Sequence, residues 1–292
     1  MPHFSDRLAE VVRRKGPLCV GLDPRWESVP KELRDRFGPD GLGEAYAAFG
    51  EAVLELVEPH CGIVKPQAAF FEAAGEAGDR ALRRLIDVAR SQYGLLTILD
   101  AKRGDIASTA TAYAQSAFDG YGADALTVNP YLGADAVEPF ISAARAATPK
   151  RGLFVLVRTS NPGGGLFQNL VCNGRPLYRI VGEEVAKWND GAIGDCGLGD
   201  VGTVVGATNP KEMAELRSAL PKVWFLVPGY GAQGGTAADV RSAFLPNGLG
   251  AIVNSSRGVT FPFHPDDPNW REKIATAAER ACAELDSGVR AP

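Results

Sequence analysis

The sequence lacks the features that mark several specialised classes of protein. No uncharged apolar stretch approaches the roughly 20 residues of a membrane-spanning helix, so we expect no association with a membrane. No block of basic residues occurs, and the formal net charge of the 292 residues is −4. This charge balance excludes broad nucleic-acid binding through phosphate neutralisation. The first residues are polar overall and give no secretory signal, so we expect a cytoplasmic protein.

Cysteine and histidine are both scarce, with five and three residues respectively. The odd number of cysteines, none of them in Cys-x-x-Cys spacing, argues against a disulfide framework and against a thiolate metal site. His3, His60 and His264 are too scattered to suggest a metal centre. We therefore expect reduced, mostly buried thiols and no metal ion.

Short apolar runs alternate with helical patterns along the whole chain. The runs predicted to be strands are 18–23, 62–67, 95–100, 125–129, 152–158, 203–207, 223–227 and 250–254. Helical spacing of apolar residues is found over 43–58, 80–92, 107–121, 134–147, 210–219, 237–244 and 268–285. Nearly continuous apolar strands are typical of a parallel sheet that is covered on both faces. The pattern predicts an α/β fold, a single-domain (β/α)8 TIM barrel over residues 1–292, with a doubly wound open sheet as the alternative.

One connection is much longer than the others. An insertion of approximately residues 161–202 follows the fifth predicted strand and contains two glycine-rich stretches, 163–165 and 191–202. A helix is predicted near 176–188 within it. The segment is either a peripheral elaboration or a mobile lid, because it begins at the C-terminal end of a strand.

The most informative stretch stands at the end of the third predicted strand. There Asp100, Lys102 and Asp105 occur where a buried strand opens into a loop. Alternation along the strand predicts that Asp100 and Lys102 point to the same side. Buried charges are costly unless they pair or take part in chemistry, so the cluster is either a structural ion-pair network or a catalytic one. Asp105 has a further alternative, which is to cap the helix that follows.

Other polar residues stand at the ends of predicted strands, where a barrel of this type builds its active site. Asp23, Lys65 and Ser160 occupy such positions on the first, second and fifth strands. The seventh strand runs into the glycine-rich stretch 228–235, and Arg257 follows the eighth. Glycine-rich backbone and a guanidinium together predict a phosphate site. The structural alternatives are tight turns for the glycines and the start of a turn for Asp23.

Taken together, these residues resemble the orotidine 5′-monophosphate decarboxylase family. The resemblance covers most of the predicted barrel and rests on Asp100-x-Lys102-x-x-Asp105-Ile106, Asp23, Lys65, Pro228-Gly-x-Gly-Ala-Gln233-Gly-Gly and Arg257. The stretch 129–133 and the long insertion are similar to the longer bacterial branch of the family. The resemblance implies a carboxy-lyase of de novo pyrimidine biosynthesis that converts orotidine 5′-monophosphate to UMP and CO₂. It implies no metal and no organic cofactor.

The resemblance also implies a role for each matched residue that surrounds the base and the ribose. Asp100 would lie against the substrate carboxylate, and Lys102 would deliver a proton to C6 of the pyrimidine. Lys65 would hold this network in register and contact the ribose. Asp23 would bind a ribose hydroxyl, and Ser160 would hydrogen-bond the edge of the pyrimidine.

Two further sets of residues follow from the same resemblance. The substrate-binding residues near the ends of the last two strands are Pro228, Gln233, Gly234 and Arg257, of which Gln233 and Arg257 would take the phosphate. Asp105 and Thr109 would reach into the active site of the neighbouring subunit. This arrangement implies a homodimer with shared active sites.

Two other functions remain open at this level. A sugar-phosphate decarboxylase or aldolase of the same superfamily would use Mg²⁺, but those relatives carry a metal-binding Glu where this chain has Lys65. A non-catalytic barrel that binds a phosphorylated ligand would need Arg257 and would have no use for Asp100 and Lys102.

Overall fold

The computed structural model describes residues 2–231 and 234–290, and eight parallel strands in it close into a barrel. In order around the barrel the strands are β1 (Leu18–Leu22), β2 (Ile63–Pro66), β3 (Leu96–Arg103), β4 (Ala125–Val128), β5 (Gly152–Arg158), β8 (Val201–Val205), β9 (Phe225–Val227) and β10 (Ala251–Ser255). The predicted (β/α)8 barrel is therefore confirmed. The open sheet is excluded because β1 pairs with both β2 and β10.

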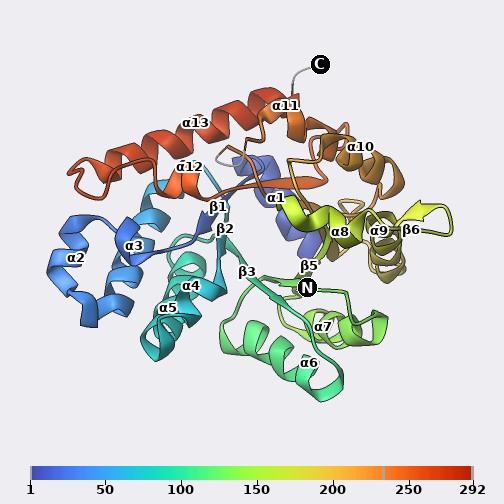
Figure 1. The fold of residues 1–292 in the computed structure, drawn as a ribbon, viewed down its shortest axis with the longest axis horizontal. Helices are drawn as coiled ribbons and strands as arrows, with labels where there is room; N and C mark the ends of the chain where they lie inside the picture. The colour runs from blue at the N-terminus through green and yellow to red at the C-terminus, as the bar shows by residue number, and fades with distance from the viewer. Residues whose placement is uncertain (1, 232–233, 291–292) are drawn as a thin grey trace.

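Helices cover the outside of the barrel between successive strands, except α1, which precedes β1 and lies across one end (Figure 1). They are α1 (Phe4–Lys15), α2 (Lys31–Phe37), α3 (Leu42–Val57), α4 (Ala68–Glu72), α5 (Gly75–Ser91), α6 (Ala107–Gln115), α7 (Ala134–Ala146), α8 (Gly165–Gln168), α9 (Leu177–Trp188), α10 (Pro210–Ala219), α11 (Ala237–Val240), α12 (Arg257–Thr260) and α13 (Trp270–Arg290). The predicted helix over 107–121 is divided, because the α-helical part ends at Gln115 and a π-helical turn follows over Ser116–Gly120. No helix in the described part of the chain combines the length and the apolar character needed to cross a bilayer.

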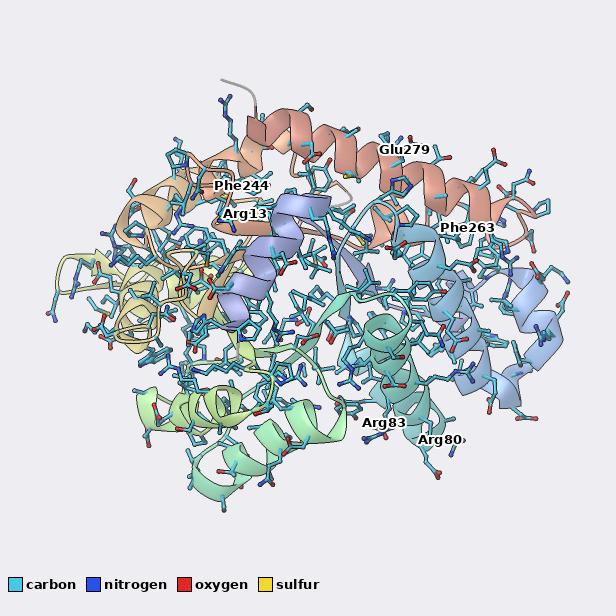
Figure 2. The ribbon with its side chains drawn as sticks, turned by 180° about the vertical axis from the view of Figure 1, so that it is seen from behind. Arg13, Arg80, Arg83, Phe244, Phe263 and Glu279 are labelled. Atoms are coloured by element: carbon cyan, nitrogen blue, oxygen red, sulfur yellow. The ribbon has the colours of Figure 1, made fainter. Side chains whose placement is uncertain are left out.

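The interior of the barrel has its own apolar core, which is closed at one end by α1. Phe4 and Leu8 of this helix pack with Phe154 and Ile252 from the strands and with Trp224, which directly precedes β9. The ring of Phe4 lies edge-on to that of Phe154, with 6.4 Å between the centroids. Seen from behind, α1 crosses this end of the barrel (Figure 2). The N-terminal ends of the strands are thereby covered, which leaves the C-terminal ends for a ligand.

The long connection between β5 and β8 contains one ordinary barrel helix and one elaboration. The predicted helix near 176–188 is present as α9, which packs against both β5 and β8. The elaboration consists mainly of α8 and an antiparallel hairpin of β6 (Val171–Cys172) and β7 (Arg175–Pro176). This hairpin projects from the edge of the molecule (Figure 1).

The cysteines follow the prediction only in part. Cys19 and Cys61 are buried, but Cys172 is exposed on the hairpin and the other two are half-buried. Burial raises the pKa of Cys61 to about 12. Its thiol is therefore protonated at neutral pH and contributes apolar packing.

Candidate active site

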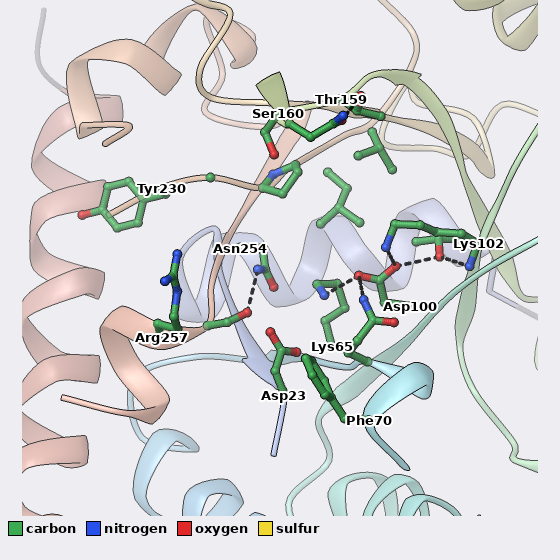
Figure 3. Close-up of a pocket in the computed structure, with 18 of the residues that line it drawn as sticks. Asp23, Lys65, Phe70, Asp100, Lys102, Thr159, Ser160, Tyr230, Asn254 and Arg257 are labelled. Carbon is green, nitrogen blue, oxygen red and sulfur yellow. Dashed lines mark hydrogen bonds and ion pairs between the residues drawn. The ribbon is translucent and has the colours of Figure 1, made fainter. Parts of the chain in front are cut away.

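A cavity of about 750 Å³ lies at the C-terminal ends of the barrel strands. The predicted site residues that line it are Asp23, Lys65, Asp100, Lys102, Ser160, Pro228 and Arg257. Figure 3 shows the cluster around Asp100 on one side of the cavity and Arg257 on the other. Closure of the barrel has therefore brought a charged cluster and a guanidinium to opposite walls of one cavity.

Asp100 is the centre of the charged cluster and accepts hydrogen bonds from four donors. Its Oδ2 accepts from Lys65 Nζ at 2.6 Å and from Gln67 Nε2 at 3.1 Å. Its Oδ1 accepts from Lys102 Nζ at 2.6 Å and from Thr127 Oγ1 at 2.9 Å. An ionised carboxylate offers about four lone-pair sites, so the acceptor capacity of Asp100 is fully used. The Lys102 ammonium is one of these four donors and is held against the carboxylate.

The two lysines of the cluster differ in exposure. The side chain of Lys65 is 5% exposed, whereas that of Lys102 is 45% exposed. Burial alone would lower the pKa of Lys65, but the carboxylates of Asp100 and Asp23 more than reverse this and hold the pKa above its usual value. Burial alone would raise the pKa of Asp100, and the charges of Lys65 and Lys102 hold it well below its usual range. Asp100 and Lys65 are therefore both charged at neutral pH.

The backbone at Lys102 departs from a regular strand. Its φ is +48°, in the left-handed region, and the register between β3 and β4 shifts at this point. The prediction that the side chains of Asp100 and Lys102 point to the same side is confirmed by the ion pair between them. The regular alternation of side chains along β3, on which this prediction rests, ends where the register shifts.

Gln67 and Thr127 belong to the cluster, and the reasoning from the sequence missed both. Gln67 follows Lys65 by two residues, so its side chain lies on the same side of the chain. Thr127 interrupts the apolar strand β4 with a hydroxyl, and a buried hydroxyl needs a partner. Each signal was visible in the sequence, but neither identifies the partner.

The wall opposite the cluster carries the candidate anion site. Arg257 begins α12 and lines the cavity. In the glycine-rich loop after β9, the N–H groups of Gly231, Gly234 and Gly235 donate to the carbonyls of Gly235, Gly231 and Gly229. These amide groups are used within the loop. The side chain of Arg257 therefore offers a positive charge on this wall, whereas these three amides are already paired with carbonyls of the loop.

Some of the predicted site residues do not line the cavity of a single chain. Asp105, Thr109 and Gly234 lie outside its lining, and Gln233 lies outside the described residues. The suggestion that Asp105 caps the next helix is wrong, because Ile106 occupies the N-cap position and its side chain makes no capping hydrogen bond. Instead, Asp105 Oδ1 accepts from the N–H of Ile106 at 2.8 Å.

The segment next to Ser160 is fastened to the barrel through Gln168 of α8. Gln168 Oε1 accepts from Arg158 Nη1 at 3.1 Å and from the Thr159 N–H at 3.0 Å. Gln168 Nε2 donates to Thr159 Oγ1 at 2.9 Å. The start of the long connection is thus anchored beside the cavity in this structure.

Known proteins resemble this chain over nearly its whole length. A sequence model of the orotidine 5′-phosphate decarboxylase / HUMPS family matches residues 16–265. An orotidine 5′-phosphate decarboxylase of Rhodopirellula baltica is 45% identical over 297 aligned positions, which cover 95% of this chain and 97% of that protein. One from Roseiflexus castenholzii is 43% identical over 282 positions, covering 96% and 95%. The solved structure of Leishmania donovani OMP decarboxylase is 35% identical, with a TM-score of 0.80 and coverage of 99% and 100%.

Proposed function

The chain belongs to the orotidine 5′-phosphate decarboxylase / HUMPS family, and we propose that it is a carboxy-lyase that converts orotidine 5′-monophosphate to UMP and CO₂. The enzyme would act in the cytoplasm, in de novo pyrimidine biosynthesis. The observation that carries the proposal is the placement of Lys102, Asp100 and Lys65 on one wall of the cavity and Arg257 on the other. The substrate has the matching shape, with a carboxylated pyrimidine at one end and a phosphate at the other.

The chemical step needs a fixed positive charge beside the reacting carbon. When the bond between C6 and the carboxylate breaks, CO₂ leaves and the electron pair stays on C6. No electron sink adjoins this carbon, so the protein stabilises the negative charge electrostatically. Lys102 Nζ, held 2.6 Å from Asp100, supplies that charge and then gives its proton to C6.

Asp100 contributes through its own negative charge. It stays ionised because the charges of Lys65 and Lys102 hold its pKa low against burial. Two like charges about 4 Å apart at an effective dielectric constant near 20 repel by about 4 kcal/mol. A substrate carboxylate placed against Asp100 feels this repulsion, which disappears as CO₂ leaves.

The remaining residues bind the parts of the substrate that do not react. Asp23 has a buried Oδ1 without a hydrogen-bond partner among the described residues, and it would accept from a ribose hydroxyl. Ser160 would bind the edge of the pyrimidine. The phosphate would be bound by Arg257 and by Gln233, the latter from the sequence stretch that also contains Pro228 and Gly234. Binding energy at the phosphate, far from C6, can be used to order the reacting end of the site.

Lys65 favours this reaction over the Mg²⁺-dependent reactions of sugar-phosphate relatives. The ammonium groups of Lys65 and Lys102 both lie 2.6 Å from the carboxylate of Asp100. A divalent cation bound to that carboxylate would face two positive charges. We therefore propose a reaction that uses neither a metal nor an organic cofactor.

We further propose that two chains form a homodimer and complete each other's active sites. Asp105 and Thr109 follow β3 closely but do not line the cavity of their own chain, which fits the role in the neighbouring site that the family resemblance implies. The test mixes Lys102→Ala chains with Asp105→Ala chains. Each heterodimer would contain one intact site, so a random mixture would regain about a quarter of the wild-type activity. Verified heterodimers that stay inactive would contradict a shared site.

The decisive experiment for the function is a decarboxylation assay on the purified protein. Orotidine 5′-monophosphate is added with and without EDTA, and its ultraviolet absorbance is followed together with the release of CO₂. We expect turnover that EDTA does not change. An unchanged substrate spectrum would instead support a barrel that binds phosphorylated ligands without chemistry. Activity lost in EDTA and restored by Mg²⁺ would support the metal-dependent alternative.

A further inference from the structure

Thr127 has no role in the substrate contacts proposed above, yet it forms hydrogen bonds with both Asp100 and Lys102, which are here called the catalytic pair. We propose that Thr127 is a positioning residue, whose hydroxyl holds Asp100 and Lys102 in the geometry needed for proton transfer. The inference rests on the proposed function, in which Lys102 gives a proton to C6. It adds a third strand, β4, to the machinery that β2 and β3 provide.

The hydroxyl of Thr127 uses all of its hydrogen-bonding capacity on the chain that carries the pair. The residue is 1% exposed. Its Oγ1 donates to Asp100 Oδ1 at 2.9 Å and accepts from the N–H groups of Ala101 at 3.0 Å and Lys102 at 2.9 Å. A hydroxyl has one donor and two acceptor sites, so this one has no alternative orientation. It therefore fixes the carboxylate and the backbone of Lys102 together.

The contact with Lys102 matters because the backbone there is strained. Lys102 has a φ of +48°, a conformation that crowds the Cβ of an L-residue. Such residues persist only where the surrounding structure holds them. Two consecutive N–H groups converge on Thr127 Oγ1 at this point. That convergence keeps the chain in the left-handed turn from which the Lys102 side chain reaches Asp100.

Thr97 provides a matched control at the other end of the barrel. It is also fully buried, on β3. Its hydroxyl donates to Asp124 Oδ2 at 3.3 Å and accepts from the Asp124 N–H at 3.3 Å. Replacement of either threonine by valine therefore removes a buried hydroxyl bound to an aspartate. Only the change at Thr127 affects the cavity.

The kinetic test compares Thr127→Val, Thr127→Ser and Thr97→Val. Loss of a hydrogen bond to a charged group predicts that Thr127→Val lowers kcat by roughly 10- to 100-fold, with KM changed by less than about twofold. Thr127→Ser keeps the hydroxyl and should regain most of the wild-type kcat. Thr97→Val should lower the melting temperature and leave kcat unchanged. A Thr127→Val enzyme with the kcat of Thr97→Val, or a serine variant as impaired as the valine variant, would overturn the proposal.

A crystal structure of the Thr127→Val variant separates this inference from the proposed function. We expect the distance from Lys102 Nζ to Asp100 Oδ1 to exceed the present 2.6 Å and the φ of Lys102 to leave the left-handed region. An unchanged ion pair and an unchanged φ would refute the positioning role whatever the activity. A wild-type protein that releases no CO₂ would refute the proposed function, while this structural comparison would still decide the role of Thr127. If Thr127→Val does not fold, Thr127→Ala is used with the same criteria.

Discussion

The barrel contains an acid-centred cluster at each end, and the two clusters are built in similar ways. At the N-terminal ends of the strands, Asp124 accepts from Arg7 Nη1 at 2.8 Å and from Arg151 Nη1 at 2.7 Å. It also accepts from the N–H of Thr97 at 3.1 Å and from the hydroxyl of the same residue at 3.3 Å. Asp100 at the opposite end likewise accepts from two cationic side chains, a hydroxyl and an N–H donor. The number of hydrogen bonds therefore does not distinguish the Asp124 cluster from the Asp100 cluster, which we propose to be catalytic.

The type of cation and its access to the cavity do distinguish them. The guanidinium groups around Asp124 keep their protons in proteins, whereas an ammonium can give one up. The side chain of Arg151 is 7% exposed, and that of Lys102 is 45% exposed. A fixed cation can donate a proton to a ligand only if it can release that proton and if it is exposed to the cavity. The Asp100 cluster meets both, and the Asp124 cluster meets neither.

Removal of the cavity-facing cation should have the largest effect on activity. In the Lys102→Ala variant the positive charge and the proton donor are both lost, so we expect kcat to fall by at least roughly 10³-fold. The fold should persist because this side chain is half exposed. The control at the other end is Arg151→Lys, for which kcat should stay within about twofold of wild type. Steady-state kinetics and circular dichroism check both; a Lys102→Ala enzyme with near-wild-type kcat would contradict the proton-donor role.

Neutralising Asp100 should mainly lower activity, whereas neutralising Asp124 should mainly lower stability. Asp100→Asn should lower kcat by roughly 10²- to 10³-fold, because the electrostatic arrangement around C6 is lost. Asp124→Asn breaks a buried pair with no reacting group nearby, so it should lower the free energy of unfolding by about 3–5 kcal/mol and leave the kcat of the folded protein unchanged. Urea unfolding and kinetics on both variants test this contrast. If Asp124→Asn lowered kcat as much as Asp100→Asn, the two clusters would not differ in role.

Loss of Arg257, on the wall opposite the Asp100 cluster, should reduce kcat/KM although this side chain is remote from the proposed position of C6. Arg257→Ala would remove the proposed charge-assisted contact to the phosphate, so we expect kcat/KM to fall by about 10²-fold. Arg84 on α5 is a suitable control, since its guanidinium pairs with Glu51 on the outside of the barrel. Arg84→Ala should change kcat/KM by less than about twofold. Equal losses in the two variants would argue against a phosphate site at Arg257.

The smallest expected effect is that of pH on the free energy of unfolding. It should arise from aspartates at both ends of the barrel. Burial raises the folded-state pKa of Asp100, but the charges of Lys65 and Lys102 lower it below its usual value. The pKa of Asp200, which directly precedes β8 at the N-terminal end of the barrel, is likewise lowered despite its burial, by His3 and Arg145. A lowered pKa adds stability above the unfolded-state value, about 3.9, and this stability is lost as the pH falls through the folded-state value. Unfolding free energy should therefore be flat from about pH 5 to 8 and decline below about pH 4. Asp100→Asn and Asp200→Asn should each flatten this decline, and an unaltered acid limb would contradict the linkage.

Much of the fold could be predicted because strand and helix periods are local properties. The strand predicted over 152–158 coincides with β5, and each of the other predicted strands overlaps a barrel strand. The strand predicted over 203–207 begins two residues too late, since β8 runs from Val201 to Val205. Gly202 looks like part of a turn in the sequence. In the barrel a glycine is required there, because a Cβ would lie 2.7 Å from the ring of Phe154.

Much of the candidate site could be predicted for a related reason. Charged residues at the end of an apolar strand are anomalous wherever the strand is placed, so Asp100, Lys102 and Lys65 could be recognised from the sequence. Thr127 and Gln67 could not, because an uncharged polar residue near a strand end is common. Only the positions of the neighbouring strands show that both side chains reach Asp100.

The sequence by itself determined the eight β/α units and the charged residues that stand at their C-terminal ends, because both follow from the order of residues along the chain. The tertiary structure decided which aspartate faces a cavity and which is sealed beneath α1. It also decided that Lys102 adopts a left-handed backbone beside a hydroxyl from the next strand. These outcomes depend on barrel closure and strand register, which join residues that have no fixed spacing in the sequence.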